Sequence, residues 1–123
     1  MFSRGCPHRC AFCGNVLHNR QRTRRRAVED VVDELRWLQG HGVKAVFEYS
    51  DEIVDSPNLT YLLDILSSVQ DLLFRAQGRC NITRDQAPML EHLAASGLRR
   101  VMWGVESFSD PVLEAMEKDL AVD

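Results

Sequence analysis

The 123-residue chain has the composition of a globular protein, with 45% hydrophobic and 27% charged residues. Its formal net charge of −3 argues against a general nucleic-acid binder, although five arginines crowd into residues 20–26. No apolar stretch approaches the roughly 20 residues of a membrane-spanning helix, and residues 1–10 lack the apolar core of a signal peptide. We therefore expect a cytoplasmic protein with neither a membrane nor a nucleic acid as its partner.

The cysteines are unevenly distributed along the chain. Three of the four, Cys6, Cys10 and Cys13, lie within eight residues near the N-terminus, while Cys80 stands alone. This clustering argues against a disulfide scaffold and favours a metal or redox site. We expect Cys80 to be a small, buried apolar residue rather than a ligand.

The first predicted elements are a helix, a strand and a second helix. Apolar residues recur at helical spacing from Val28 to Leu38, and Gly40 and Gly42 should end that helix. Residues 43–50 are rich in β-branched and aromatic side chains and predict a buried parallel strand. Ser56 followed by a proline predicts an N-cap, with the second helix extending to Val69.

The alternation continues to the end of the chain. Residues 72–80 predict a second strand, residues 88–96 a third helix stopped by Gly97, and residues 98–107 a third strand. Asp110 and Pro111 repeat the cap pattern and should begin a last helix. Alternating helices and strands predict an α/β fold with a parallel sheet, built as a single domain over residues 1–123.

In parallel sheets, ligands gather at the carboxyl ends of the strands. This rule selects residues 50–52, 78–81 and 104–107. The cysteine loop would join the same rim if residues 1–4 supply a short strand ahead of it.

The cysteine spacing is CxxxCxxC, written CPHRCAFC in this chain. Three thiolates on one loop can hold three irons of a [4Fe-4S] cluster and leave the fourth iron open. An open metal position suits catalysis, because a substrate or cofactor can bind there directly.

This spacing resembles the signature of the radical S-adenosylmethionine (SAM) superfamily. Further segments resemble the cobalamin-binding type of that family over nearly the whole chain: SRGCPHRCAFCGN, RRRAVEDVVDELRWL, SDE, QGRCN and RRVMWGVESFSDPVLEAMEK. The resemblance implies a partial (βα) barrel and an enzyme that initiates radical chemistry on a substrate that the sequence does not identify. In that family the open iron binds the amino and carboxylate groups of SAM, and one electron from the cluster cleaves a carbon-sulfur bond to give methionine and a 5'-deoxyadenosyl radical.

The resemblance also implies the molecules that work with the chain. A reductant such as a flavodoxin or ferredoxin would supply the electron. Cobalamin in the full-length protein is a further candidate cofactor, and residues outside these 123 would bind it. Because the family core resembles a six-strand barrel, we expect the remaining strands to lie outside this chain. The isolated polypeptide should then bind a cluster weakly, self-associate and cleave little SAM.

By matching position, the resemblance makes Cys6, Cys10 and Cys13 the cluster ligands, with Phe12 as the aromatic residue before the last cysteine. It places Asp51 near the SAM amine.

The resemblance also assigns polar residues at the strand ends. Ser50 departs from the family pattern, which often has an acidic residue there. Arg79, Glu106 and Ser107 lie where the family directs polar groups to the SAM carboxylate or ribose, and a carboxylate suits two ribose hydroxyls. The catalytic residues stay unassigned.

Other interpretations of the cysteines remain open. They could bind zinc with His8, His18 or Cys80 as the fourth ligand, which would make the chain a non-catalytic zinc or iron-sulfur module. Cys10 and Cys13 could also form a dithiol redox pair.

The other candidate residues have structural alternatives. Asp51, Glu52, Glu106 and Ser107 could end strands in solvent, and the arginine run could be a solvated face or bind a phosphate-bearing substrate. We expect His41 and His92 on helix surfaces, and we expect Trp37 and Trp103 to pack rather than to contact a cofactor.

Overall fold

A computed structural model describes residues 1–15, 17 and 22–122. Its main sheet has three parallel strands in the order β3-β4-β5, formed by β3 (Ala45–Phe47), β4 (Leu73–Arg79) and β5 (Leu98–Gly104). The α/β class with a parallel sheet is therefore confirmed. The described residues do not close a barrel.

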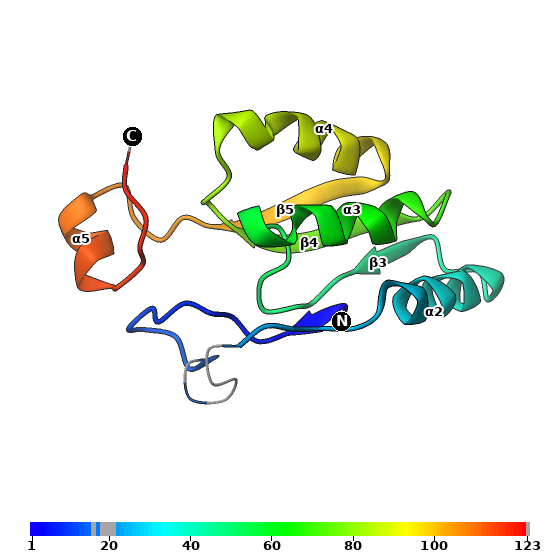
Figure 1. Ribbon diagram of the computed structural model, residues 1–123, viewed down its shortest axis with the longest axis horizontal. Helices are drawn as coiled ribbons and strands as arrows, with labels where there is room; N and C mark the ends of the chain where they lie inside the picture. Colours follow the sequence, from blue (N-terminus) through cyan, green and yellow to red (C-terminus); the bar gives the residue numbers. More distant parts are fainter. Residues whose placement is uncertain (16, 18–21, 123) are drawn as a thin grey trace.

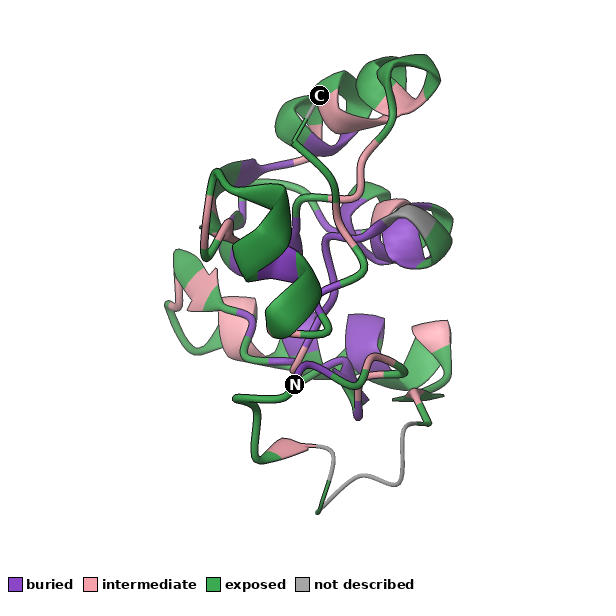
Figure 2. Ribbon diagram, turned by 90° about the vertical axis from the view of Figure 1, so that its left-hand side faces the viewer, coloured by how far each residue is buried: buried purple, intermediate pink, exposed green. Residues whose placement is uncertain are grey.

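Three helices cover one face of this sheet: α2 (Val28–Gly40), α3 (Leu59–Ser67) and α4 (Ala87–Ala95), with α3 packed between the other two (Figure 1). A short helix, α5 (Asp110–Ala115), lies beyond the carboxyl ends of the strands. Buried positions lie toward the inside of the molecule, between helices and sheet (Figure 2). The core joins apolar side chains from every layer, including Val31, Leu62, Ile65, Phe74 and Leu93.

The opposite face of the sheet is exposed. Residues alternate along β4, so that Phe74 and Ala76 are buried against the helices while Leu73 and Arg75 point to the other side. Phe47 on β3 pairs with Arg75 in the ladder, is 40% exposed and carries the Arg75 guanidinium over its ring. The prediction of a buried first strand was therefore wrong, because β3 is an edge strand with one uncovered face.

The first predicted strand is also shorter than expected. β3 ends at Phe47, and the chain then separates from β4. It pairs with β4 again at Val54, which forms an isolated parallel bridge with Gly78. Gly78 permits this return, because a Cβ there would lie 2.2 Å from the Val54 carbonyl oxygen. Residues 48–52 consequently bulge away from the sheet at its carboxyl edge.

Residues 1–4 do supply a short strand, but it does not join the parallel sheet. β1 (Ser3–Arg4) pairs antiparallel with β2 (Arg24–Arg25) in a separate two-stranded sheet. Side chains of the bulge connect it to the rest: Glu48 Oε1 accepts from the Phe2 N–H at 2.7 Å, and Ser50 Oγ accepts from the Ser3 N–H at 2.8 Å.

Helix ends differ from the predicted caps. A 3-10 turn, η1 (Ser56–Asn58), precedes α3, and its N-cap is Asp55 rather than Ser56. A second such turn, η2 (Arg84–Gln86), precedes α4 with a capping box between Thr83 and Gln86. Asp110 is the first residue of α5 and not its cap, because the N-cap is Ser109.

The predicted glycine ends of two helices are confirmed, with Gly40 as the last residue of α2. Gly42 follows α2 with φ of 87°, and Gly97 follows α4 with φ of 105°. Gly97 is doubly constrained, since a Cβ would meet the Leu72 carbonyl oxygen at 2.3 Å. None of the helices in the described part of the chain is long and apolar enough to cross a membrane.

Candidate functional site

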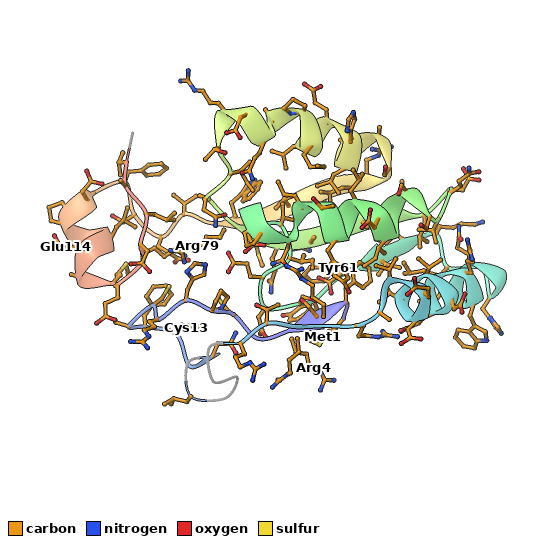
Figure 3. All side chains as sticks on the ribbon, in the orientation of Figure 1. Met1, Arg4, Cys13, Tyr61, Arg79 and Glu114 are labelled. Carbon is orange, nitrogen blue, oxygen red and sulfur yellow. The ribbon has the colours of Figure 1, made fainter. Side chains whose placement is uncertain are left out.

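The cysteine loop and the carboxyl ends of the strands meet at one end of the molecule, where Cys13 and Arg79 are labelled (Figure 3). They enclose an open cavity of about 380 Å³. All three N-terminal cysteines line it. The other lining residues come from the cysteine segment, the bulge, the ends of β4 and β5, and the segments before and after α5: Phe12, Asn15, Asp51, Glu52, Gln77, Gly78, Arg79, Met102, Trp103, Gly104, Glu106 and Lys118.

The bulge fixes the position of the cysteine loop. Asp51 Oδ2 accepts a hydrogen bond from the Gly5 N–H at 2.6 Å, immediately before Cys6. At the other end of the loop, the Ala11 N–H donates to the Met116 carbonyl at 2.8 Å, which ties the loop to the end of α5. A turn in which the Cys13 N–H donates to the Cys10 carbonyl at 3.0 Å brings the last two cysteines together.

The three thiols differ in exposure and environment. Cys10 is buried, Cys6 is half-buried and Cys13 is exposed. Burial, opposed in part by a backbone hydrogen bond from His8, raises the pKa of the Cys6 thiol to about 12. The thiol donates to Glu52 Oε2 at 3.2 Å. Bound iron would replace this proton, because a thiolate is the form that binds metal.

Arg79 lies on the wall of the cavity, at the end of β4. It is 4% exposed, and its Nη1 donates to Cys10 Sγ at 3.6 Å. Its Nη2 is buried without a partner among the described residues. A buried guanidinium with an unused donor at a cavity wall is suited to bind an anionic group there, as well as to stabilise a thiolate.

Glu106 and Lys118 face each other across the same cavity. Glu106 follows β5 in the left-handed region with φ of 64°, and its Oε1 lies 3.2 Å from Lys118 Nζ. The Lys118 ammonium is nearly buried and lies 5.8 Å from the ring centroid of Phe12. The ion pair thus places a carboxylate and an ammonium together at the wall of the cavity.

The structure brings together most of the predicted site residues. Cys6, Cys10 and Cys13 share the cavity with Asp51, Arg79 and Glu106. Ser107 is not among the described residues that line it, and its Oγ instead accepts from the Ser109 N–H at 3.1 Å in the turn before α5.

The remaining candidates lie elsewhere or differ from expectation. Ser50 is a buried residue of the bulge, and its Oγ donates to Glu48 Oε1 at 2.5 Å. Cys80 is exposed in a neighbouring depression beside Trp103, so the prediction of a buried Cys80 was wrong. The reason is that Cys80 directly follows β4, beyond the layer of covering helices. His18 lies outside the described residues.

The surface predictions for the other residues are mostly confirmed. His41 and His92 are exposed on or next to helices. Trp37 is 61% exposed and packs on the His41 ring, whereas Trp103 reaches the wall of the cysteine cavity. In the arginine run, Arg25 donates to Asn58 and Arg26 pairs with Glu34, so the described part of the run includes partners for acidic and polar groups.

Two residues of the cavity had no individual role from the sequence. Glu52 belongs to residues 50–52, which the strand-end rule selected with a solvent-exposed strand end as the alternative. It is 5% exposed and contacts both Cys6 and His8. Burial raises the pKa of Glu52 and lowers that of His8. The sequence gives no sign of Lys118, because this residue follows α5 and reaches the cavity only in the folded chain.

The donor set fits a cluster with one open position. Three cysteines line one cavity, and Cys80, the fourth cysteine of the chain, lies in the separate depression. The space next to the thiols is bordered by carboxylates and cations, which match the amino, carboxylate and hydroxyl groups of SAM.

A family model and several known proteins match this chain. The model of the family described as the radical SAM superfamily matches residues 1–122. An uncharacterized methyltransferase of Pyrococcus horikoshii is 30% identical over 98% of this chain and 26% of the relative. The cytidylyl-2-hydroxyethylphosphonate methyltransferase of Streptomyces wedmorensis is 32% identical over 94% of this chain and 22% of the relative.

A third relative matches a shorter segment. The ribosomal protein uS12 methylthiotransferase of Cutibacterium acnes is 45% identical over 38% of this chain and 10% of the relative. No solved structure matches the chain. The chain spans about a quarter of the length of the two methyltransferases. It belongs to the radical SAM superfamily, a family of enzymes that use a [4Fe-4S] cluster and SAM.

Proposed function

We propose that Cys6, Cys10 and Cys13 hold a [4Fe-4S] cluster in the cavity and that the neighbouring polar residues position SAM against its open iron. The observation that carries this proposal is the convergence of the three thiols, from one anchored loop, on a cavity lined by Asp51, Arg79 and other charged side chains. When bound, the cluster supplies the electron for reductive cleavage of SAM, which starts radical chemistry on the substrate.

The residues of the chain have separate tasks in this proposal. Asp51 holds the loop through the Gly5 N–H and presents a carboxylate to the SAM amine. Arg79 donates to the Cys10 sulfur and turns its unused Nη2 donor toward the SAM carboxylate. Glu106, held by Lys118, accepts hydrogen bonds from the ribose hydroxyls. Ser107 contributes to this part of the site by stabilising the turn between Glu106 and α5.

Electrons would enter on the exposed side of the loop. Cys13 is exposed and Phe12 is 52% exposed, so a reductant such as a flavodoxin or ferredoxin can approach the cluster there. SAM would occupy the cavity, against the strand ends. The electron donor and the substrate then reach the cluster from different directions.

The whole protein is proposed to carry more than this chain. The uncovered face of β3, β4 and β5 exposes Phe47, Leu73 and Met102, which further strands of a partial barrel would cover. In this view residues 1–123 form one part of a single barrel domain. The names of the two methyltransferases favour transfer of a methyl group as the reaction of the whole protein, with cobalamin bound by another region as the candidate methyl carrier.

The test is cluster assembly in variants that each lack one cysteine. Replacing any one of Cys6, Cys10 and Cys13 by alanine should abolish anaerobic reconstitution of a [4Fe-4S] cluster, measured by iron and sulfide content and by absorbance. Cys80→Ala is the matched control and should reconstitute like the unmodified chain, because Cys80 lies in a separate depression. Full cluster content in the three N-terminal variants would contradict the proposal.

A further inference from the structure

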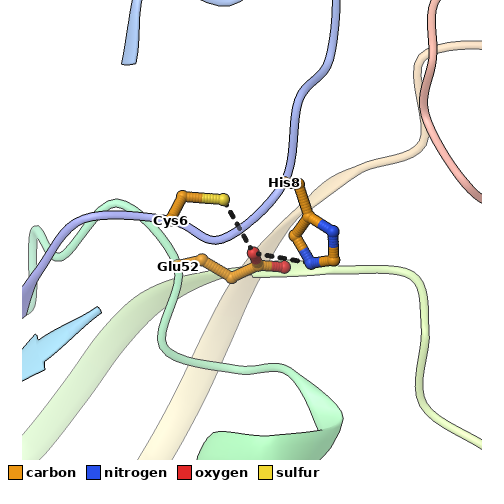
Figure 4. A group of neighbouring side chains, drawn as sticks. All are labelled: Cys6, His8 and Glu52. Atoms are coloured by element: carbon orange, nitrogen blue, oxygen red, sulfur yellow. Dashed lines mark hydrogen bonds and ion pairs between the residues drawn. The ribbon is translucent and has the colours of Figure 1, made fainter. Parts of the chain in front are cut away.

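A compact group joins Cys6 and His8 of the cysteine loop to Glu52 of the bulge (Figure 4). Glu52 Oε2 accepts from Cys6 Sγ at 3.2 Å and lies 3.5 Å from His8 Nε2. One ligand atom from each residue lies within 4.8 Å of the others. The fold thus gathers a thiol, an imidazole and a carboxylate at one place.

The carboxylate in this group is not satisfied by the protein. Glu52 is 5% exposed, and its Oε1 is buried without a hydrogen-bond partner among the described residues. A buried carboxylate oxygen without a partner is costly. A cation at the group would remove that cost.

The spacing matches tetrahedral coordination of a zinc-like ion. Zinc binds thiolate sulfur at about 2.3 Å, and imidazole nitrogen and carboxylate oxygen at about 2.0 to 2.2 Å. In a tetrahedron these bond lengths separate the ligand atoms by about 3.4 to 3.6 Å. The two separations that involve Glu52 Oε2, 3.2 Å and 3.5 Å, are close to these values, and the third pair of ligand atoms lies within 4.8 Å, so side-chain rotations would complete the geometry.

We infer that the cluster-free chain holds one divalent transition-metal ion of the zinc class through Cys6 Sγ, His8 Nε2 and the Glu52 carboxylate. Binding releases the Cys6 thiol proton to solvent and changes no oxidation state. Three protein ligands leave a fourth position for water. Because Cys6 serves both groups, the ion and the cluster exclude each other, and the ion controls when the loop accepts a cluster.

Cobalt(II) is the probe for this site, because its visible spectrum reports tetrahedral geometry and thiolate ligation. We expect the anaerobic, cluster-free chain to bind one cobalt ion with a thiolate charge-transfer band. Cys6→Ala should remove the band, and Glu52→Gln and His8→Ala should each weaken binding about tenfold or more. Cys13→Ala is the matched control, since it removes a cluster ligand but should leave cobalt affinity unchanged.

Two results would overturn the inference. Absence of cobalt binding would do so, as would a loss of affinity in Cys13→Ala with no effect of His8→Ala, which would place the ion among the three cysteines. His8→Ala also guards against misfolding as an explanation, because the His8 side chain is 23% exposed and circular dichroism can verify the fold.

A second measurement tests the competition. Chain loaded with zinc should assemble its cluster more slowly than metal-free chain, and His8→Ala should reduce this delay. Equal rates for the loaded and metal-free forms would contradict the exclusion of the cluster by the ion. Failure of the metal-free chain to assemble any cluster would instead count against the function proposed above, so the two failures are distinguishable.

Discussion

The helix-covered face of the sheet and the rim of the cysteine cavity both contain buried side chains. Those of the sheet face are apolar, whereas those of the rim are charged. Between sheet and helices lie apolar side chains such as Ile65 and Leu66, both 0% exposed. At the rim lie Glu52 and Arg79, which are 5% and 4% exposed. The apolar layer gains free energy when it leaves water, whereas the charged rim loses hydration and recovers only what its partners provide.

The difference shows that the apolar layer stabilises the fold, whereas burial of polar groups at the rim lowers its stability. Two buried atoms without a partner among the described residues, Glu52 Oε1 and Arg79 Nη2, belong to residues that line the cavity. Such groups persist where the surrounding structure holds them in place or a ligand satisfies them. The apolar layer supplies that support. Changes in the two regions should therefore act on different measurements.

The largest effect on stability is expected from the apolar layer. Ile65→Ala removes a fully buried side chain from α3 and should lower the free energy of unfolding by about 2 to 5 kcal/mol. Urea denaturation measures this loss. Trp37→Ala on the exposed side of α2 is the control and should change stability by roughly 0.5 kcal/mol or less. Equal losses in the two variants would contradict the assignment of the core.

The same contrast explains what the sequence could predict. The apolar repeat from Val28 to Leu38 and the stops at Gly42 and Gly97 are local signals, and the helices they delimit are present. Burial of β3 was not local, because it depends on whether a second layer covers Phe47. The extra turn η1 before α3 likewise follows from packing at Asp55 and Asn58, which no spacing rule encodes.

The site was predictable where one loop carries it and not where distant segments converge. The CxxxCxxC spacing identified Cys6, Cys10 and Cys13, which line one cavity. Glu52 looked like an ordinary strand end, because the sequence does not show that residues 48–52 bulge toward the cysteine loop. Lys118 lies far from the motif in sequence, so only the tertiary structure shows its contact with Glu106.

At the rim, Glu106→Gln should change ligand binding more than stability. If the carboxylate holds the SAM ribose, the substitution removes a charged hydrogen-bond partner and should cost roughly 1.5 to 3 kcal/mol of binding, a tenfold to hundredfold loss of SAM affinity. Cluster content should stay unchanged. Glu114→Gln on exposed α5 provides the control, since Glu114 does not line the cysteine cavity. Unchanged SAM affinity in Glu106→Gln would place this residue outside the binding site.

The smallest effect is expected from the buried carboxyl of Asp55 and should appear as a dependence of stability on pH. Burial raises the pKa of Asp55 above its ordinary value of 3.8, although hydrogen bonds from Asn58 and the charge of Arg25 oppose this shift. The folded chain therefore holds the Asp55 proton more tightly than the unfolded chain does. This contribution to stability is fully present below the unfolded pKa and is lost as pH rises through the higher folded pKa.

Asp55→Asn removes the titrating group while keeping an oxygen that can accept from the Asn58 amide. The difference in unfolding free energy between Asp55→Asn and the unmodified chain should therefore move in favour of the variant as pH rises from about 4 toward neutrality. Urea denaturation at several pH values measures this slope. The slope is compared because the asparagine amide places N–H groups where Asp55 Oδ2 has no partner among the described residues, and unpaired N–H groups shift stability equally at every pH. A pH-independent difference would mean that Asp55 titrates alike in the folded and unfolded chain, and burial would then impose no cost on this carboxyl.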